Sequence, residues 1–364
     1  MSVKRSPTQT ELDYPASKRT VASRDEPEQN PPDLTNDDYT VGWICALAIE
    51  LAASQAMLDE IHPDLPLEPG DSNIYTLGRM GQHNIAMVCL PEGTTGTNAA
   101  ATAANDLLRS YRKVRFGLMV GVGGGAPSLP NDDPFKDVRL GDVVVSTPQG
   151  SHGGVIQYDF GKTVAQGNFI QTGSLNKPPS VLLAGVAKLK ANYMRGSQKL
   201  GSYMTTMLEM YPSMETGFVY PGKDCDQLFE ADYSHVDMRS KCDKCDQTRT
   251  LERESRMTDG AAIHYGLIGS ANQVMRHGST REKLRRQHEV LCFEMEAAGL
   301  MENFPCIVIR GICDYSDSHK NKRWQGYAAV TAAGYAKELL SYIPSDTVKS
   351  TTDAAKIMNM GPSN

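Results

Sequence analysis

Four carboxylates stand where apolar runs of this sequence end, and carboxylates in such places can move protons or balance positive charge. Glu50 follows the first apolar run, Asp314 follows the last short one, and Glu294 and Glu296 open an Ala/Gly-rich stretch. A buried carboxylate is costly without a partner, so packing alone does not favour this pattern. The four groups together support general acid, general base and electrostatic chemistry. From its position alone, Glu50 fits equally well as a first-turn helix residue, where negative charge is favoured.

Short apolar runs alternate with helical patterns along residues 39–343, which predicts an α/β fold. The run CIVI at 306–309 reads as a strand because it is brief, β-branched and bounded by Pro305 and Gly311. Open α/β sheets bind ligands beyond the carboxyl ends of their strands, where Asp314 lies. We predict a three-layer α/β/α sandwich around a central mixed sheet. The expected strands are 41–47, 74–80, 83–90, 116–120, 140–146, 263–268 and 306–309, and the expected helices are 50–57, 98–111, 179–193, 276–288 and 324–342, with another opened by 294–296.

Two motifs resemble the purine nucleoside phosphorylase and nucleosidase superfamily, which contains methylthioadenosine/adenosylhomocysteine nucleosidase. They are FEMEAAG at 293–299 and IRGICD at 309–314. The segment DYSDSHKNKRWQGY at 314–327 looks like the fungal branch, in which such domains occur alone or at the front of NLR-like receptors. The likeness spans residues 39–343 and implies a nucleoside phosphorylase-like sandwich.

The resemblance implies a role for each carboxylate in breaking a purine N-glycosidic bond. Asp314, protonated, would donate toward N7 of the base, and Glu50 would activate a water molecule. Glu296 would bind the ribose hydroxyls and stabilise the oxocarbenium ion. Met295 would pack beneath the sugar, and Glu294 would hold the sugar hydroxyls or brace the helix.

The loop at 270–274 is implied to contact the base. In bacterial nucleosidases a Phe of the matching loop stacks on the purine. Here Gln273 takes its place and offers an amide that can read the purine edge, with Val274 beside it. Cys313 stands where relatives often have Ser, and we expect it to contact Asp314.

The run GVGGGA at 121–126 satisfies the dinucleotide fingerprint G-x-G-x-x-[GA]. We reject this interpretation because Pro127 and Pro130 follow, where the fingerprint requires a helix. Glycines at a strand end instead let a flat ligand approach the backbone. The superfamily places the ribose and the nucleophile here, so we assign Gly123 to the substrate site.

The nucleophile separates hydrolases from phosphorylases. Phosphorylases of this superfamily carry an Arg and a Ser at the positions matching Met119 and Val122, and two apolar side chains cannot bind phosphate in their place. We therefore predict a purine nucleosidase that cleaves adenosine-type nucleosides with water, giving free base and ribose. Two alternatives stay open. One is a phosphorylase holding phosphate through backbone N–H groups at 93–97 or 121–125, although the first loop is more simply a helix cap. The other is a module that senses a nucleoside or nucleotide.

The composition describes a soluble intracellular protein. Lys and Arg number 37 against 43 Asp and Glu, a net charge of −6, and without a basic block no nucleic-acid partner is expected. No apolar run reaches the length of a membrane span, and the N-terminus lacks a signal-peptide core. The pairs Lys4-Arg5 and Lys18-Arg19 add a nuclear alternative to a cytoplasmic location, although a solvated tail explains them more simply.

We expect a disordered tail at 1–37, one catalytic domain at 38–344 and a C-terminal tail at 345–364. The first tail has almost no large apolar residues to offset the entropy of ordering. Within the domain, residues 195–258 form a polar insertion that compact bacterial enzymes lack, expected to cover the pocket or a subunit interface. The expected partner is a small purine nucleoside, and the domain is expected to form homo-oligomers.

The eight cysteines fit reduced thiols better than a disulfide framework. Cys242 and Cys245 form a C-x-x-C pair in the insertion, which is typical of zinc when a second ligand pair follows. Cys225 and His235 could complete four ligands, but their spacing is not that of a standard finger. We therefore predict no metal, no other cofactor, and no effect of chelation on activity.

Overall fold

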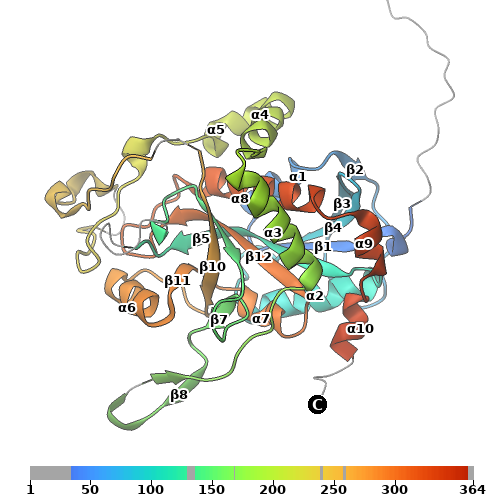
Figure 1. Cartoon of the computed structure of the whole chain (residues 1–364), viewed down its shortest axis with the longest axis horizontal. Coiled ribbons are helices and arrows are strands. Elements are labelled where there is room, and N and C mark those ends of the chain that lie inside the picture. Colours follow the sequence, from blue (N-terminus) through green and yellow to red (C-terminus); the bar gives the residue numbers. More distant parts are fainter. Residues whose placement is uncertain (1–33, 129–135, 168, 238–240, 257–259, 360–364) are drawn as a thin grey trace, which may run out of the picture. The chain divides into compact units, whose positions relative to one another are not determined.

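A computed structural model describes residues 34–128, 136–167, 169–237, 241–256 and 260–359, so most of the predicted N-terminal tail lies outside the described residues. Residues 35–364 group into one unit, built on a ten-stranded mixed sheet (Figure 1). Its strands are β1 (Val41–Cys45), β2 (Glu60–His62), β3 (Tyr75–Met80), β4 (His83–Cys89), β5 (Phe116–Gly125), β6 (Val143–Ser146), β7 (Val155–Gln157), β10 (Ile263–Ser270), β11 (Val290–Glu294) and β12 (Cys306–Asp314). They follow the order β11-β10-β6-β12-β5-β1-β4-β3-β2, with β7 paired to β10, and a separate hairpin joins β8 (Gly161–Thr163) to β9 (Phe169–Gln171).

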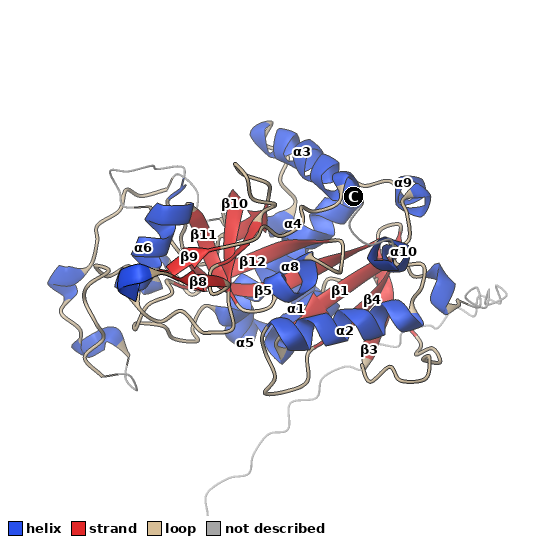
Figure 2. Cartoon of the chain, turned by 90° about the horizontal axis from the view of Figure 1, so that it is seen from below, coloured by secondary structure: helices blue, strands red, loops and turns tan. Residues whose placement is uncertain are grey.

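Helices cover both faces of the sheet (Figure 2). The helices are α1 (Ala48–Gln55), α2 (Thr97–Ser110), α3 (Ser180–Met194), α4 (Leu200–Met210), α5 (Glu215–Phe218), α6 (Gly278–His288), α7 (Ala297–Met301), α8 (Gln325–Ser341), α9 (Ser345–Ser350) and α10 (Ala354–Asn359). Side chains alternate along β1, so Val41 and Trp43 join the core beneath α8 while Ile44 joins the core beneath α2. The predicted three-layer α/β/α sandwich around a mixed sheet is confirmed. In the described ranges, no helix has both the length and the apolar character needed to cross a membrane.

The strands β5 and β12 are longer than predicted, and their extra length positions the candidate site. β5 continues through the glycine run to Gly125 and pairs in parallel with β12 as far as Gly124, which lies opposite Asp314. Because the glycines belong to a strand rather than to a strand–helix turn, the rejection of a dinucleotide fingerprint is confirmed.

The strand β11 was not predicted. It pairs in parallel with β10 and in antiparallel fashion with β5, where Cys292 and Phe293 lie opposite two of the glycines. Glu294 therefore ends a strand, and α7 begins only at Ala297, so the predicted helix start at 294–296 was too early. The backbone N–H and C=O groups of the short buried run before Glu294 are hydrogen-bonded to two neighbouring strands.

The segment predicted as a mobile C-terminal tail contains the short helices α9 and α10. Val348 and Ala354 are buried there, and Asp353 forms an ion pair with Arg115. A few anchoring contacts order the segment although its sequence is mostly polar.

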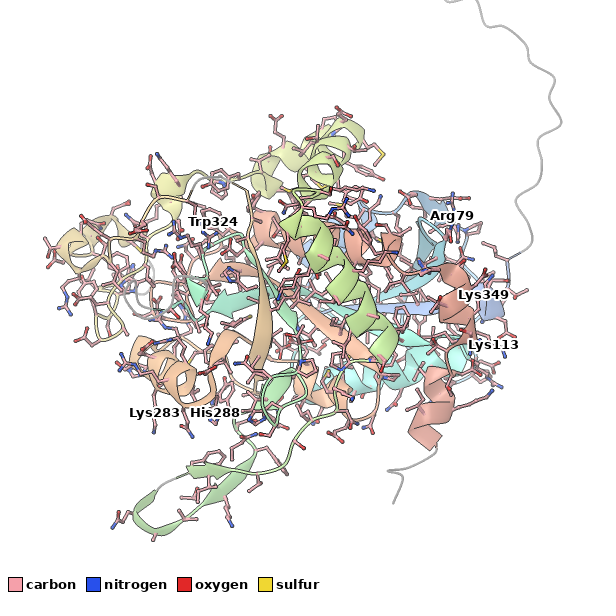
Figure 3. All side chains as sticks on the ribbon, in the orientation of Figure 1. Arg79, Lys113, Lys283, His288, Trp324 and Lys349 are labelled. Atoms are coloured by element: carbon pink, nitrogen blue, oxygen red, sulfur yellow. The ribbon has the colours of Figure 1, made fainter. Side chains whose placement is uncertain are left out.

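The insertion at 195–258 holds α4, α5 and several single 3₁₀ turns. Its Tyr220 packs edge-on against Trp324, labelled in Figure 3, with ring centroids 5.4 Å apart. Its Arg253 donates a 2.7 Å hydrogen bond to the Tyr315 hydroxyl. The insertion is thereby packed on the segment that follows Asp314.

Candidate active site

A cavity of about 220 Å³ gathers residues from the ends of several strands. All eight predicted site residues line it, although they come from separate parts of the chain. They are Glu50, Gly123, Gln273, Val274, Glu294, Met295, Glu296 and Asp314. The sheet brings them together because β5, β11 and β12 run side by side and end here, and α1 begins just after β1.

Glu50 is 2% exposed and lies in the first turn of α1. Its Oε2 accepts hydrogen bonds from the N–H groups of Ala46 (2.8 Å) and Leu47 (3.0 Å), and its Oε1 accepts one from Val122 (2.7 Å). Burial raises the pKa of Glu50, although Arg310 and these hydrogen bonds oppose the rise. A buried carboxylate with a raised pKa, facing a cavity, can accept a proton from water.

Arg310 lies on β12, is 1% exposed, and balances three carboxylates. Its Nη2 donates to Glu294 and lies 3.4 Å from Glu296 Oε2, and its Nη1 lies 4.0 Å from Glu50 Oε1. Burial lowers the pKa of Arg310, but the carboxylates more than offset this and raise it. Arg310 was not among the predicted site residues. The sequence feature that could have identified it is a charged residue within an otherwise apolar strand, because a buried charge needs an opposite charge nearby.

Glu294 braces the turn between β11 and α7. Its carboxylate accepts hydrogen bonds from the N–H groups of Glu296 (3.1 Å) and Ala297 (3.0 Å). These donors lie at the start of α7, where backbone N–H groups lack partners within the helix. Of the two roles predicted for Glu294, these contacts favour the brace.

Glu296 is buried beside other charges. Its Oε1 accepts a 3.3 Å hydrogen bond from Gly96 N–H. Burial raises the pKa of Glu296, Arg310 opposes the rise, and the nearby Glu294 and Glu50 add to it, so that the pKa is about 7 against an ordinary value of 4.5. Glu296 therefore changes charge near neutral pH.

Glu296→Gln should remove one pH dependence of stability. Because the folded chain holds this proton more tightly than the unfolded chain, its contribution is full below about pH 4.5 and is lost as pH rises through about 7. The measurement is the melting temperature from about pH 5 to about pH 8, with the exposed Glu302→Gln as matched control. Equal pH profiles for wild type and Glu296→Gln would place the proton elsewhere.

Asp314 ends β12 and is 4% exposed. Its Oδ1 accepts a 2.9 Å hydrogen bond from Ser316 N–H, and its Oδ2 lies 3.2 Å from Cys313 Sγ and 2.9 Å from Lys320 Nζ. Burial lowers the pKa of Lys320, but the Asp314 carboxylate reverses this and raises it. The expected contact with Cys313 is present. Lys320 was missed because nothing in its polar segment distinguishes it from a solvated lysine.

The remaining lining residues differ in exposure. Gln273 and Val274 are exposed where they border the cavity, and Met295 is half-buried. Phe293 also lines the cavity, and its buried ring meets Tyr158 edge-on with centroids 5.5 Å apart. Phe293 was not predicted as a site residue.

In the loop at 93–97, which was considered for anion binding, two backbone N–H groups already donate hydrogen bonds to side chains of the protein. Gly96 N–H donates to Glu296, and Thr97 N–H donates a 2.9 Å hydrogen bond to Asn272 Oδ1. Side chains of distant segments therefore cap the first turn of α2, whereas the N-cap residue of the loop, Gly96, makes no side-chain cap of its own.

The glycine run makes room for protein side chains. A Cβ added at Gly121 would collide with Glu50 and Arg310, and one added at Gly123 would collide with Cys292. Gly123 and Gly124 also line the cavity, so the expectation that these glycines open the backbone to a ligand stays a prediction. They allow the buried charges to lie against β5.

A curated relative matches most of this chain. It is a nucleotide-binding leucine-rich repeat (NLR)-like protein of Hyaloscypha variabilis, 44% identical over 319 residues, which cover 87% of this chain and 31% of the relative. The chain thus spans about a third of the length of that protein. No family model matches the chain.

Several solved structures have a similar fold. Futalosine hydrolase of Helicobacter pylori and the 5′-methylthioadenosine/S-adenosylhomocysteine nucleosidase of the same organism each show 16% identity and a TM-score of 0.52, covering 84% of this chain and 98% of theirs. The corresponding nucleosidase of S. pneumoniae shows 17% identity and a TM-score of 0.50, covering 84% of this chain and 100% of its own. At this identity the likeness establishes the fold. The resemblance carried by the two motifs is confirmed at that level: the chain has the fold of the nucleoside phosphorylase and nucleosidase superfamily.

Proposed function

We propose that this chain hydrolyses the N-glycosidic bond of adenosine-type purine nucleosides, giving free base and ribose. The observation that carries the proposal is the meeting of Glu50, Glu296 and Asp314 around one cavity. Structures of similar fold are named as hydrolases and nucleosidases, which supports hydrolysis as the reaction type. The preference for adenosine-type nucleosides is the finer part of the proposal.

Glu50 is proposed as the base that activates water. In hydrolysis the water oxygen bonds to C1′ of the ribose while the bond from C1′ to the base nitrogen breaks, and the water gives a proton to Glu50. The raised pKa of Glu50 suits proton acceptance. Its three backbone hydrogen bonds hold the carboxylate in one orientation before substrate arrives.

Glu296 is proposed to offset the positive charge that develops on the ribose. Arg310 contacts both Glu294 and Glu296, so the carboxylate is held in place by fixed neighbours rather than by solvent. Since the charge it offsets exists mainly in the transition state, Glu296 should affect kcat more than KM.

Asp314 is proposed to protonate the leaving base at N7. Asp314 takes up this proton from solvent and gives it to N7 as the bond from C1′ to the base nitrogen breaks. It is left as a carboxylate, which the ion pair with Lys320, 2.9 Å away, stabilises.

Phosphate fits this cavity poorly as the nucleophile. Met119 is fully buried in the core, Val122 gives its N–H to Glu50, and the N–H groups of Gly96 and Thr97 are occupied. Four carboxylates line the cavity and would repel a dianion, with only Lys320 among the lining residues to attract one. These contacts favour water over phosphate.

We expect base release without phosphate and an unchanged rate when phosphate is added. The measurement is chromatography of adenosine, inosine, guanosine and methylthioadenosine with and without phosphate, with assay of the sugar product. Glu50→Gln should suppress base release while nucleoside binding, measured by calorimetry, persists, and Glu302→Gln serves as control. Base release that requires phosphate and yields ribose 1-phosphate would contradict the proposal.

A second candidate is a sensing module that binds a nucleoside or nucleotide without turnover. One observation favours it: the matched relative is named as an NLR-like protein, and this chain corresponds to about a third of it. Saturable nucleoside binding by the folded wild type, with no base released, would support sensing over hydrolysis.

A further inference from the structure

A second cavity, of about 290 Å³, lies between the insertion and the segment after β12. His235 and Cys242 line it from the insertion, and His319 lines it from the other side. Asp314 and Lys320 line both this cavity and the candidate active site. A ligand bound here would therefore lie next to the proposed proton donor.

Three possible metal ligands of the insertion lie close together, and two of them, His235 and Cys242, line this cavity. One ligand atom from each of His235, Cys242 and Cys245 lies within 4.8 Å of the others. Ligand atoms around a tetrahedral zinc ion are about 3.3 to 3.8 Å apart, so a small inward movement would close the set. Nδ1 of His235 accepts a 3.0 Å hydrogen bond from Asp237 N–H, which a metal bound at this nitrogen would replace.

His319 lines the opposite wall, outside the group of three whose ligand atoms lie within 4.8 Å of one another. Its ring centroid lies 5.3 Å from that of His235, and the ring stacks on Phe229 at 4.0 Å. His319 is 7% exposed, and neither of its ring nitrogens has a hydrogen-bond partner in the part of the chain that the structure describes, although Nδ1 lies 3.5 Å from Asp317 Oδ1. Metal-binding histidines commonly direct one ring nitrogen to a carboxylate and give the other to the metal.

We propose that His235, Cys242, Cys245 and His319 bind a zinc ion. Two thiolates and two imidazoles are a common closed, four-coordinate set for structural zinc, and sulfur donors disfavour magnesium and calcium. Two thiolate charges balance the charge of the ion. The metal also satisfies the buried Nε2 of His319, which is otherwise costly to leave without a partner.

The ion would join the insertion to the segment that carries the proposed proton donor. His319 directly precedes Lys320, whose Nζ lies 2.9 Å from Asp314 Oδ2. His235 N–H already donates a 2.9 Å hydrogen bond to Ser318 Oγ, so the two segments are in contact without the metal. Zinc would fix this contact and, with it, the position of Lys320.

This proposal reverses the prediction of no metal made from the sequence. That prediction considered Cys225 as a ligand, but Cys225 Sγ instead accepts a 3.1 Å hydrogen bond from Arg323. The fourth donor comes from a segment beyond β12, so the ligand spacing along the chain does not match a standard finger. Only the packing of the insertion on that segment brings the donors together.

Metal content tests the site directly. The full chain, purified without a polyhistidine tag, should contain about one zinc per chain by elemental analysis. The double variant Cys242→Ser, Cys245→Ser should lose it, whereas Cys225→Ser, a cysteine lining the same cavity, should keep it. Cobalt added to the metal-free wild type should give thiolate-to-metal charge-transfer absorption, which tests the site even if the double variant does not fold.

Two variants on the opposite wall test the fourth ligand. His319→Ala should lower zinc affinity. Asp317→Asn should lower it about 10- to 100-fold, because it removes the carboxylate beside the His319 ring. Unchanged affinity in His319→Ala would exclude His319. No zinc and no cobalt absorption in the reduced wild type, or a Cys242–Cys245 disulfide found by mass spectrometry, would overturn the site. These readouts measure metal rather than turnover, so they stand apart from the nucleosidase proposal.

Discussion

Asp314→Asn should slow hydrolysis of purine nucleosides by about 100- to 10,000-fold, the usual range for loss of a general acid. The amide is close in size to the carboxylate and can still accept from Ser316 N–H, so folding should persist. It has no acidic proton to give to the base. The measurement is kcat with an adenosine-type nucleoside, together with a thermal unfolding curve.

A second substrate with a different leaving group makes this test more specific. The leaving group of a p-nitrophenyl riboside is p-nitrophenolate, which departs without being protonated. Asp314→Asn should therefore slow hydrolysis of this substrate far less than hydrolysis of a purine nucleoside. Asp64→Asn makes the same chemical change at an exposed position and should have no effect. Near-wild-type turnover of purine nucleosides by the folded Asp314 variant would remove this residue from the mechanism.

Arg310→Met should lower the free energy of unfolding by about 3–5 kcal/mol, because removing one partner of a buried ion pair leaves charge without compensation. Arg310 faces Glu50, Glu294 and Glu296, and all four side chains are almost fully buried. Methionine fills similar space but cannot balance the carboxylates. Chemical denaturation of wild type and variant measures the difference.

A second substitution separates lost charge balance from lost packing. Adding Glu294→Gln to Arg310→Met removes the carboxylate that contacts the guanidinium most directly and should restore part of the lost stability. Arg310→Lys keeps the charge, so its free energy of unfolding should lie between those of wild type and Arg310→Met. If the double variant is no more stable than Arg310→Met, the loss comes from packing rather than from the carboxylates.

The sequence was sufficient to predict eight of the residues that gather at the cavity. Glu50 and Asp314 follow apolar strands, and the ends of neighbouring strands meet in space, so the strand pattern alone places them near each other. The resemblance added Gln273 and Glu296 on motif positions. Their placement around one cavity needed no knowledge of side-chain contacts.

The partners of the carboxylates could not be predicted in the same way. Lys320 reaches Asp314 from a polar segment whose course depends on the packing of the insertion, and the strand pattern says nothing about such a course. The donors His235 and His319 meet for the same reason. Strand β11 was missed because its short run adjoins the motif that reads as a helix start, and only its two neighbouring strands show it to be extended.

The double pairing of β11 has a consequence for how the candidate site moves. Strands β11, β10, β6, β12 and β5 form a closed circuit of hydrogen bonds, because β11 pairs with β10 on one side and β5 on the other. Detaching any one of them breaks ladders with two neighbours, so local fraying from an edge is not available to them. Glu294 and Asp314 end two strands of this circuit. Their relative position is therefore kept or lost cooperatively, and adjustment to a substrate is left to side chains and to the loops outside the circuit.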